Sequence, residues 1–332
     1  MPMDIKLIDL HCDTLDKCVG NGSALDSPEL HFCIAKRPQR LRICQAAAIF
    51  IDSKYKGEEA RARFLKAYEV LLREEKSQAK NLNVLRDLRG ISDRLDDKPI
   101  AIFLTVEGGS VLAGEIEWVD KLHRMGVKML TLTWNGENEL CGGVGSDKGF
   151  TPFGRQVVAR MENLGMAVDA SHLNDRSFWQ LCEFAAKPFC ASHSNSRAVC
   201  NHPRNLTDEQ FKEIVRRGGV VGLNYYYNFI VESGETNSID DLLRHLHHFL
   251  ELGGENTVAL GSDFDGAQLP KYLDGIEKLP ALIDAIERSG VGKEIANKLL
   301  FGNAARFLGD YTTPSGEARG AGKTCDYREQ HS

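Results

Sequence analysis

The chain has 332 residues, of which 42% are hydrophobic and 27% charged, and its formal net charge at pH 7 is −6. This composition is typical of a soluble globular protein with a sizeable core, and the negative charge argues against nucleic acid as a partner. No apolar run approaches the ~18 residues of a membrane span, and the N-terminal segment lacks a signal-peptide pattern. We therefore expect a cytoplasmic protein with no membrane partner.

The nine cysteines of the sequence are odd in number and contain no Cys-x-x-Cys pair. This pattern argues against a disulfide framework and against a structural zinc ribbon. We therefore expect most of these cysteines to be small, buried apolar side chains.

Eight short runs rich in β-branched and aliphatic residues follow one another along the chain, and each is expected to form a strand. They cover residues 7–12, 45–51, 101–106, 128–134, 166–171, 189–193, 220–226 and 257–262. Helical patterns fall between them, as in the charged segment 58–89, after Gly114 and in 154–165. Asn174 and Thr207 stand where helix N-caps belong. The chain thus alternates strand and helix.

Strands that alternate with helices imply a parallel sheet, and eight such units predict an α/β fold, a (β/α)8 barrel of the TIM type like that of metal-dependent hydrolases. An open Rossmann-like sheet is the main alternative, but no Gly-x-Gly-x-x-Gly follows the first predicted strand. We expect one barrel domain over residues 1–310. The polar, glycine-rich segment 311–332 has no periodicity and is expected to form a flexible C-terminal tail.

Acid or imidazole side chains stand at the carboxyl ends of five of the predicted strands. They are His11, Asp13, Glu107, His172, His193 and Asp263. The carboxyl strand ends form the active site of such a barrel, so these side chains are expected to converge. Because side chains alternate along a strand, His11 and Asp13 point the same way and can bind one ion together.

The residue types at these strand ends predict metal chemistry. Imidazoles and carboxylates together suit zinc and similar divalent ions, and a carboxylate such as Glu107 can place one oxygen on each of two metals. Two ions ~3.5 to 4 Å apart acidify a water between them, which becomes a nucleophile near neutral pH. Asp263 could then accept and return the proton. The alternative for Asp263 is a turn carboxylate in SDFDG, a role that suits Asp265 better.

The same segments resemble the renal, or membrane, dipeptidase family of two-zinc peptidases. The likeness covers about residues 6–308 and rests on the His-x-Asp pair, TVEGG, LTLTWN, VDASH, SHSNSRAVCNHPRNLTDE and GSDFDG, in the family's order. It implies two Zn²⁺ cofactors, with His11 and Asp13 on one ion, His172 and His193 on the other, and Glu107 bridging both. It also implies that Asp263 is the catalytic proton shuttle. Arg204 would bind the terminal carboxylate of the substrate, with a surface salt bridge as the alternative role.

One departure from the family concerns the fourth predicted strand, where mammalian members carry a histidine that helps polarise the scissile carbonyl. Here the segment reads TLTWNGENEL, with Trp134 nearest that position. An indole cannot exchange a proton at neutral pH. Polarisation would then fall to zinc, Asn135 or Asn138, and Trp134 is either a substrate contact or barrel packing. Asn224, at the end of the seventh predicted strand, is a further substrate-binding candidate.

The resemblance implies a zinc-dependent dipeptidase that cleaves free dipeptides, including those with a C-terminal D-residue, and a homodimer is the expected assembly. The main alternative is a binuclear metal amidohydrolase that acts on another small amide, such as an N-acyl or cyclic amino acid. A non-enzymatic barrel would need a broken ligand set, and all six positions are intact.

Overall fold

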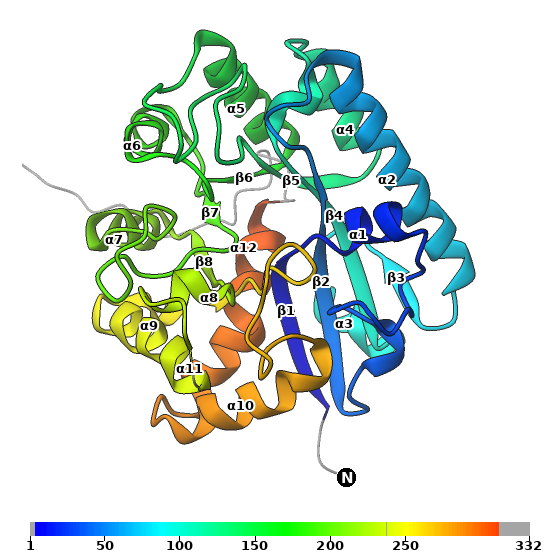
Figure 1. Ribbon diagram of the computed structural model, residues 1–332, viewed down its shortest axis with the longest axis vertical. Coiled ribbons are helices and arrows are strands. Elements are labelled where there is room, and N and C mark those ends of the chain that lie inside the picture. The colour runs from blue at the N-terminus through cyan, green and yellow to red at the C-terminus, as the bar shows by residue number, and fades with distance from the viewer. Residues whose placement is uncertain (1–3, 237, 312–332) are drawn as a thin grey trace, which may run out of the picture.

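The computed structural model describes residues 4–236 and 238–311, so the predicted C-terminal tail lies outside the described residues from position 312 onward. Parallel strands close into a ring in the order β1, β2, β4, β5, β6, β7, β8 and β9, and helices surround the ring (Figure 1). The short β3 pairs with the start of β4. The fold is therefore the predicted (β/α)8 barrel with one additional strand.

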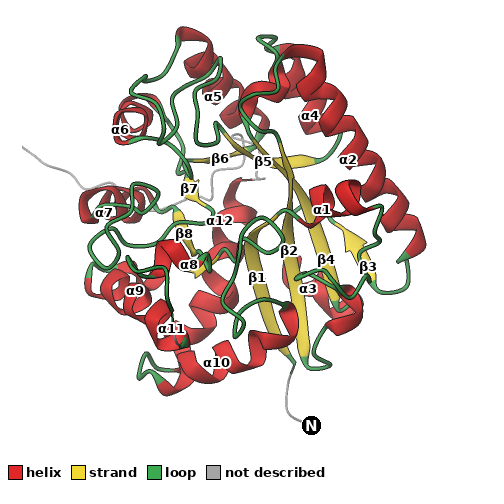
Figure 2. Cartoon of the chain, in the orientation of Figure 1, coloured by secondary structure: helices red, strands yellow, loops and turns green. Residues whose placement is uncertain are grey.

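Strands form the centre of the molecule and helices its rim, as Figure 2 shows. The strands are β1 Ile5–Cys12, β2 Leu41–Phe50, β3 Leu82–Val84, β4 Ile100–Glu107, β5 Val127–Thr131, β6 Ala167–Asp169, β7 Cys190–Ala191, β8 Val220–Leu223 and β9 Val258–Leu260. The helices are α1 Thr14–Asn21, α2 Gly57–Ser77, α3 Ile91–Asp97, α4 Glu117–Arg124, α5 Pro152–Leu164, α6 Asp175–Phe184, α7 Asp208–Arg217, α8 Tyr227–Ile230, α9 Ile239–Glu251, α10 Leu279–Arg288, α11 Lys293–Asn297 and α12 Asn303–Tyr311. None of the described helices combines the length and the apolar character needed to cross a bilayer.

All eight predicted strands are present, as β1, β2 and β4 to β9. The predicted helix 58–89 is wrong in its last part, because α2 ends at Ser77 and β3 follows it. Leu82 in β3 is buried and pairs with Ile100 at the start of β4. This pairing decides the local structure, and a strand of three residues is too short to show a period in the sequence.

The barrel is closed at one end by apolar packing. Phe307 of α12 belongs to one buried cluster with Ile8, Phe103 and Met129 from the strands. That cluster also contains Ala167 and Val220, which begin β6 and β8, and Ala101 near the start of β4. Helix α12 therefore covers the amino-terminal end of the barrel. Polar side chains are therefore concentrated at the opposite, carboxyl end.

The predicted N-caps fix two turns at that carboxyl end. The Asn174 side chain accepts a hydrogen bond from Ser177 N at the start of α6. Thr207 and Gln210 form a capping box at the start of α7. Both contacts satisfy amide groups that a helix start leaves without partners, so they define where each loop ends and each helix begins.

Candidate active site

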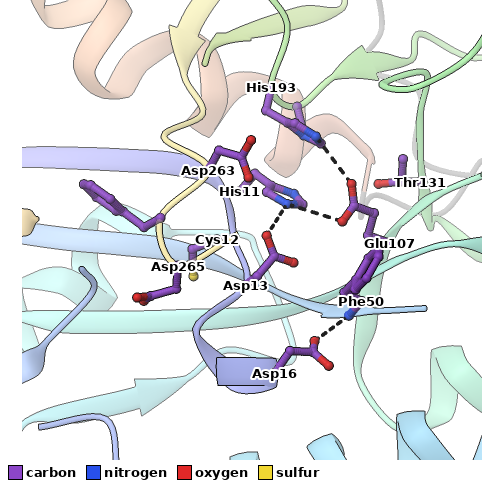
Figure 3. A network of polar contacts seen from close by, with 12 residues as sticks. His11, Cys12, Asp13, Asp16, Phe50, Glu107, Thr131, His193, Asp263 and Asp265 are labelled. Carbon is purple, nitrogen blue, oxygen red and sulfur yellow. Dashed lines mark hydrogen bonds and ion pairs between the residues drawn. The ribbon is translucent and has the colours of Figure 1, made fainter. Parts of the chain in front are cut away.

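The five predicted metal ligands meet at the carboxyl ends of the barrel strands, and Figure 3 shows four of them facing one another: His11, Asp13, Glu107 and His193. Glu107 lies at the centre. Its Oε1 is 2.8 Å from His172 Nε2 and 3.4 Å from His193 Nε2. Its Oε2 is 3.8 Å from His11 Nε2, and Asp13 Oδ2 lies 3.1 Å from the same nitrogen. One carboxylate thus faces two different pairs of side chains.

The backbone at the strand ends adopts unusual conformations around these side chains. His172 has φ 69° and Asp263 has φ 64°, in the left-handed region that non-glycine residues rarely adopt. Such residues cluster at active sites. Gly108 follows Glu107 with φ 113°, and a Cβ there would lie 2.3 Å from Ile51 O. The close approach of the chain beside Glu107 therefore requires glycine.

The site concentrates negative charge in a buried space. Burial lowers the pKa of His172 and that of His193 well below the ordinary value, which keeps both rings neutral and able to bind a metal. Burial acts in the same direction on His11, but the charges of Asp13 and Glu107 outweigh it and raise the pKa of His11 to about 10. Carboxylates that attract a proton this strongly also attract a metal cation.

The donor atoms of this cluster suit a divalent metal cation. Ligand atoms of His11, Glu107 and His193 lie within 4.8 Å of one another, and so do those of His11, Asp13 and Asp263. Asp13 Oδ1 is buried and has no hydrogen-bond partner among the described residues. A buried carboxylate oxygen needs a hydrogen bond or a cation. Mixed nitrogen and oxygen donors are the set that zinc and similar ions bind.

Each histidine of the second pair has a polar partner on its other ring nitrogen. His172 Nδ1 lies 2.9 Å from Asn135 Oδ1. His193 Nδ1 lies 2.7 Å from Ser192 Oγ, and that hydroxyl donates to Asp169 Oδ2 over 2.6 Å. These acceptors favour the tautomer with the proton on Nδ1, which leaves the Nε2 lone pairs free to bind a metal. Asn135, predicted to bind substrate, thus contacts the predicted ligand His172 and fixes its ring.

Ser192 and Asp169 contact a predicted ligand, and the ligand motifs alone do not reveal them. Both stand inside segments that the sequence marks, FCASH and VDASH, close to a predicted ligand. Thr131 in the neighbouring β5 also donates to Asp169, over 2.6 Å. The signal that points to them is a polar residue within an apolar strand, because a buried hydroxyl or carboxylate needs a partner.

We expect Ser192→Ala to lower the affinity of the protein for metal ~10- to 100-fold, because the His193 ring loses the group that orients it. Competition with a chromophoric chelator measures that affinity. Ser196→Ala is the matched control, since the Ser196 hydroxyl is also buried but has no hydrogen-bond partner among the described residues. Equal affinities of the two variants would contradict the role of Ser192.

Arg204 is a buried cation near the ligand cluster. Its Nη1 donates to Ser194 Oγ over 3.2 Å and its Nη2 to His193 O over 3.0 Å, whereas Nε has no hydrogen-bond partner among the described residues. Arg204 is only 4% exposed, so it is not part of a surface salt bridge. Burial lowers its pKa. Glu107 and Asp263 act on it in the opposite direction from a distance, and an anionic ligand in direct contact would stabilise this buried charge further.

The loop after β9 carries two aspartates with different contacts. Asn224 Nδ2 donates to Asp263 Oδ2 over 3.0 Å, so Asn224, a substrate-binding candidate, holds this carboxylate in place. Burial raises the pKa of Asp263. Asp265 instead accepts hydrogen bonds from Thr14 Oγ1 and His31 N. Asp265 therefore stabilises the loop through these hydrogen bonds, whereas Asp263 points to the ligand cluster.

A cavity of about 380 Å³ opens beside the ligands. It is lined by Glu107, Trp134, Asn135, His172, Tyr226, Phe229, Asp263, Gly266, Ala267 and Gln268. The Trp134 ring centre is 6.3 Å from that of His172, and Trp134 packs edge-on against Phe50 at 5.1 Å. Trp134 is thus a wall of the cavity as well as a packing residue. Asn138 does not line this cavity, and its side-chain amide donates a hydrogen bond to Leu132 O, which stabilises the loop that contains it.

Comparison with known proteins identifies the family. A family model described as membrane dipeptidase (peptidase family M19) matches residues 2–318. An uncharacterized protein in the pqqA 5' region of Klebsiella pneumoniae is 35% identical over 224 residues, which are 64% of this chain and 83% of that protein. An uncharacterized dipeptidase of Schizosaccharomyces pombe is 34% identical over 216 residues, which are 62% of this chain but only 52% of the yeast protein.

Two solved structures share the fold over most of the chain. A metallopeptidase from Rhodobacter sphaeroides, liganded with a phosphinate mimic of the dipeptide L-Ala-D-Ala, has a TM-score of 0.87 at 25% identity and covers 92% of this chain and 99% of its own. The dipeptidase AC of family M19 has a TM-score of 0.87 at 26% identity, with 92% and 98% covered. These matches confirm the predicted fold and family. The chain belongs to the membrane dipeptidase family, peptidase family M19, whose members hydrolyse peptide bonds.

Proposed function

We propose that the protein is a dipeptidase that uses two zinc ions. The ligands would be divided as follows: His11 and Asp13 on one ion, His172 and His193 on the other, and Glu107 on both. The observation that carries this proposal is the position of Glu107, whose Oε1 faces the histidine pair and whose Oε2 faces His11. When bound, the ions would supply Lewis acidity and lower the pKa of a water molecule.

Asp263 is proposed to carry the proton from the attacking water to the leaving amine. Its buried position raises its pKa, so it accepts a proton more readily than an exposed aspartate does. The amide of Asn224 contacts Oδ2 and thereby fixes the orientation of the carboxylate. One oxygen of Asp263 is held in this way, and the other is available to exchange the proton.

Arg204 is proposed to bind the C-terminal carboxylate of the dipeptide. Its planar guanidinium has an Nε without a hydrogen-bond partner among the described residues, and it lies next to the backbone of the proposed ligand His193. Such a fork suits a carboxylate with two oxygens. The L-Ala-D-Ala mimic bound by the Rhodobacter relative supports a small dipeptide substrate and tolerance of a C-terminal D-residue. Trp134 and Asn135 would contact the substrate from the cavity wall.

The proposed function is tested by amino-acid release from a panel of L,L and L,D dipeptides, each beside its C-terminally amidated partner. The zinc-loaded protein should cleave the free dipeptides and cleave the amides far more slowly, because an amide lacks the charge that Arg204 binds. Hydrolysis of N-acyl or cyclic amino acids without hydrolysis of dipeptides would favour the alternative amidohydrolase and reject the proposal.

We expect Arg204→Met to lower kcat/KM for free dipeptides on the order of 10²-fold, since removing one partner of a buried charge pair costs ~2 to 5 kcal/mol. The rate for amidated dipeptides should change little, so the preference for a free carboxylate should disappear. Arg216→Met is the control, because Arg216 is exposed and pairs with Glu213 on the surface. An unchanged preference in Arg204→Met would contradict the assignment.

We also propose a cytoplasmic location. All eight cysteines of the described residues are free thiols, which is typical of a reducing compartment.

The family likeness further leads us to expect a homodimer. Light scattering of the purified protein measures the assembly directly, and a mass equal to that of one chain would reject the homodimer.

A further inference from the structure

A second cavity of about 320 Å³ lies beside the metal ligands, on the side of β1 and β2. It is lined by Asp13, Asp16, Lys17, Gly20, Asn21, Phe50, Trp134, Asp265 and Gly266. Two of these residues, Trp134 and Gly266, also line the first cavity, so the two spaces are neighbours. In Figure 3, Asp16 and Phe50 lie next to Asp13 and Glu107, on the side of the cluster away from His193.

The position of the second cavity relative to Arg204 indicates which part of a dipeptide it would receive. Arg204 is bound to the end of β7 through His193 O, whereas Phe50 ends β2. These two strands lie on opposite sides of the closed ring. This step rests on the proposed function, in which the substrate carboxylate binds Arg204 and the scissile carbonyl lies at Glu107. The N-terminal residue of the dipeptide then extends toward β2, and the side chain of that residue enters the second cavity.

Asp16 is a carboxylate of this cavity that a substrate could contact. Its Oδ2 accepts a hydrogen bond from Phe50 N over 2.6 Å, and no cation of the described residues is within ion-pair distance of its carboxylate. Lys17 is exposed, and Arg63, which attracts Asp16 from farther away, lies over the Tyr55 ring at 4.2 Å. Burial raises the pKa of Asp16 to about 8, although the hydrogen bond from Phe50 N acts in the opposite direction.

The other acidic groups of the cavity have different partners. Asp13 belongs to the ligand cluster, and Asp265 is held by Thr14 and by His31 N. Asp16 is therefore the carboxylate that remains for a ligand. A cation placed beside it would stabilise its ionised form.

The aromatic walls fit the same kind of ligand. Phe50 and Trp134 pack edge to face with their ring centres 5.1 Å apart. Aromatic rings pack well on the methylene stem of a long basic side chain and attract its charged end. We propose that Asp16 makes this cavity a subsite for a cationic N-terminal side chain, so that the enzyme prefers dipeptides that begin with lysine, ornithine or arginine.

The test compares two dipeptides of nearly equal shape, Lys-Ala and norleucyl-Ala, which differ in the terminal ammonium group. With the zinc-loaded wild-type protein we expect kcat/KM for Lys-Ala to exceed that for norleucyl-Ala about tenfold or more, because charge-assisted hydrogen bonds are the stronger ones. Asp16→Asn should remove this preference through a loss on Lys-Ala alone, since the asparagine can still accept the hydrogen bond from Phe50 N. Asp52→Asn is the control, because Asp52 pairs with Lys54 outside both cavities and its loss should leave the preference unchanged.

The outcomes separate this inference from the function on which it rests. Equal rates on the two dipeptides with the wild-type protein would overturn the inference and leave the dipeptidase assignment intact, whether or not the variant folds. An equal loss of kcat/KM on both dipeptides in Asp16→Asn would also overturn the inference, because Asp16 would then contact a part of the substrate that both dipeptides share. No hydrolysis of any dipeptide by the wild-type protein would reject the proposed function, and the subsite with it.

Discussion

Glu107→Gln is expected to reduce dipeptide hydrolysis on the order of 10³-fold or more, and to lower the number of bound metal ions from two to one or none. The carboxylate of Glu107 faces His172 and His193 with one oxygen and His11 with the other. A glutamine replaces one of these oxygens by an NH₂ group, which cannot bind a cation. The change also removes a negative charge that would help to compensate the two proposed dications in a buried site.

The measurement for Glu107→Gln is elemental analysis of the dialysed protein, combined with the rate on a free dipeptide. Glu162→Gln is a matched control, because Glu162 is also buried but accepts a hydrogen bond from Lys187 N away from the ligand cluster. This control should keep both ions and its activity. Two tightly bound ions in Glu107→Gln, together with normal activity, would show that Glu107 does not bridge a metal pair.

Asp263→Asn is expected to lower kcat ~10²- to 10⁴-fold, the usual size of a general acid-base contribution, while both metal ions stay bound. An asparagine keeps the shape of the side chain and can still contact Asn224, but it cannot accept and release a proton. The raised pKa of the native carboxyl group, caused mainly by burial, is the property that is lost.

The measurement for Asp263→Asn requires kcat and metal content on the same preparation. Loss of a metal ion together with activity would instead assign Asp263 as a ligand, a role that its closeness to His11 and Asp13 allows geometrically. A kcat close to that of the wild-type protein would exclude Asp263 as the proton carrier. Only a large loss of kcat with two ions retained supports the proposed role.

The strands of this barrel could be predicted because each is a run of buried apolar residues that stands out from its surroundings. Strand β4 shows this well, since Ile100–Glu107 is buried along its whole length. β3 could not be predicted, because its three residues are defined by pairing with β4 rather than by a pattern of their own. The helical charge pattern before β3 continues past Ser77, where α2 ends.

The convergence of the candidate ligands could be predicted because strand ends of one barrel meet at one end of the molecule. His172 and His193 follow two different strands, yet their Nε2 atoms lie 3.0 Å apart. The contact from Asp169 through Ser192 to His193 could not be predicted, because it depends on which side chains face each other across β6 and β7. Whether Trp134 lines the cavity could not be predicted either, because its position depends on the conformation of the loop after β5.

The proposed mechanism depends on two metal ions at this site with Glu107 between them. A crystal structure of the zinc-loaded protein with data collected on both sides of the zinc absorption edge tests it most directly. We expect two anomalous peaks ~3.5 to 4 Å apart, each in contact with one oxygen of Glu107. A single peak, or two peaks that do not share Glu107, would contradict it.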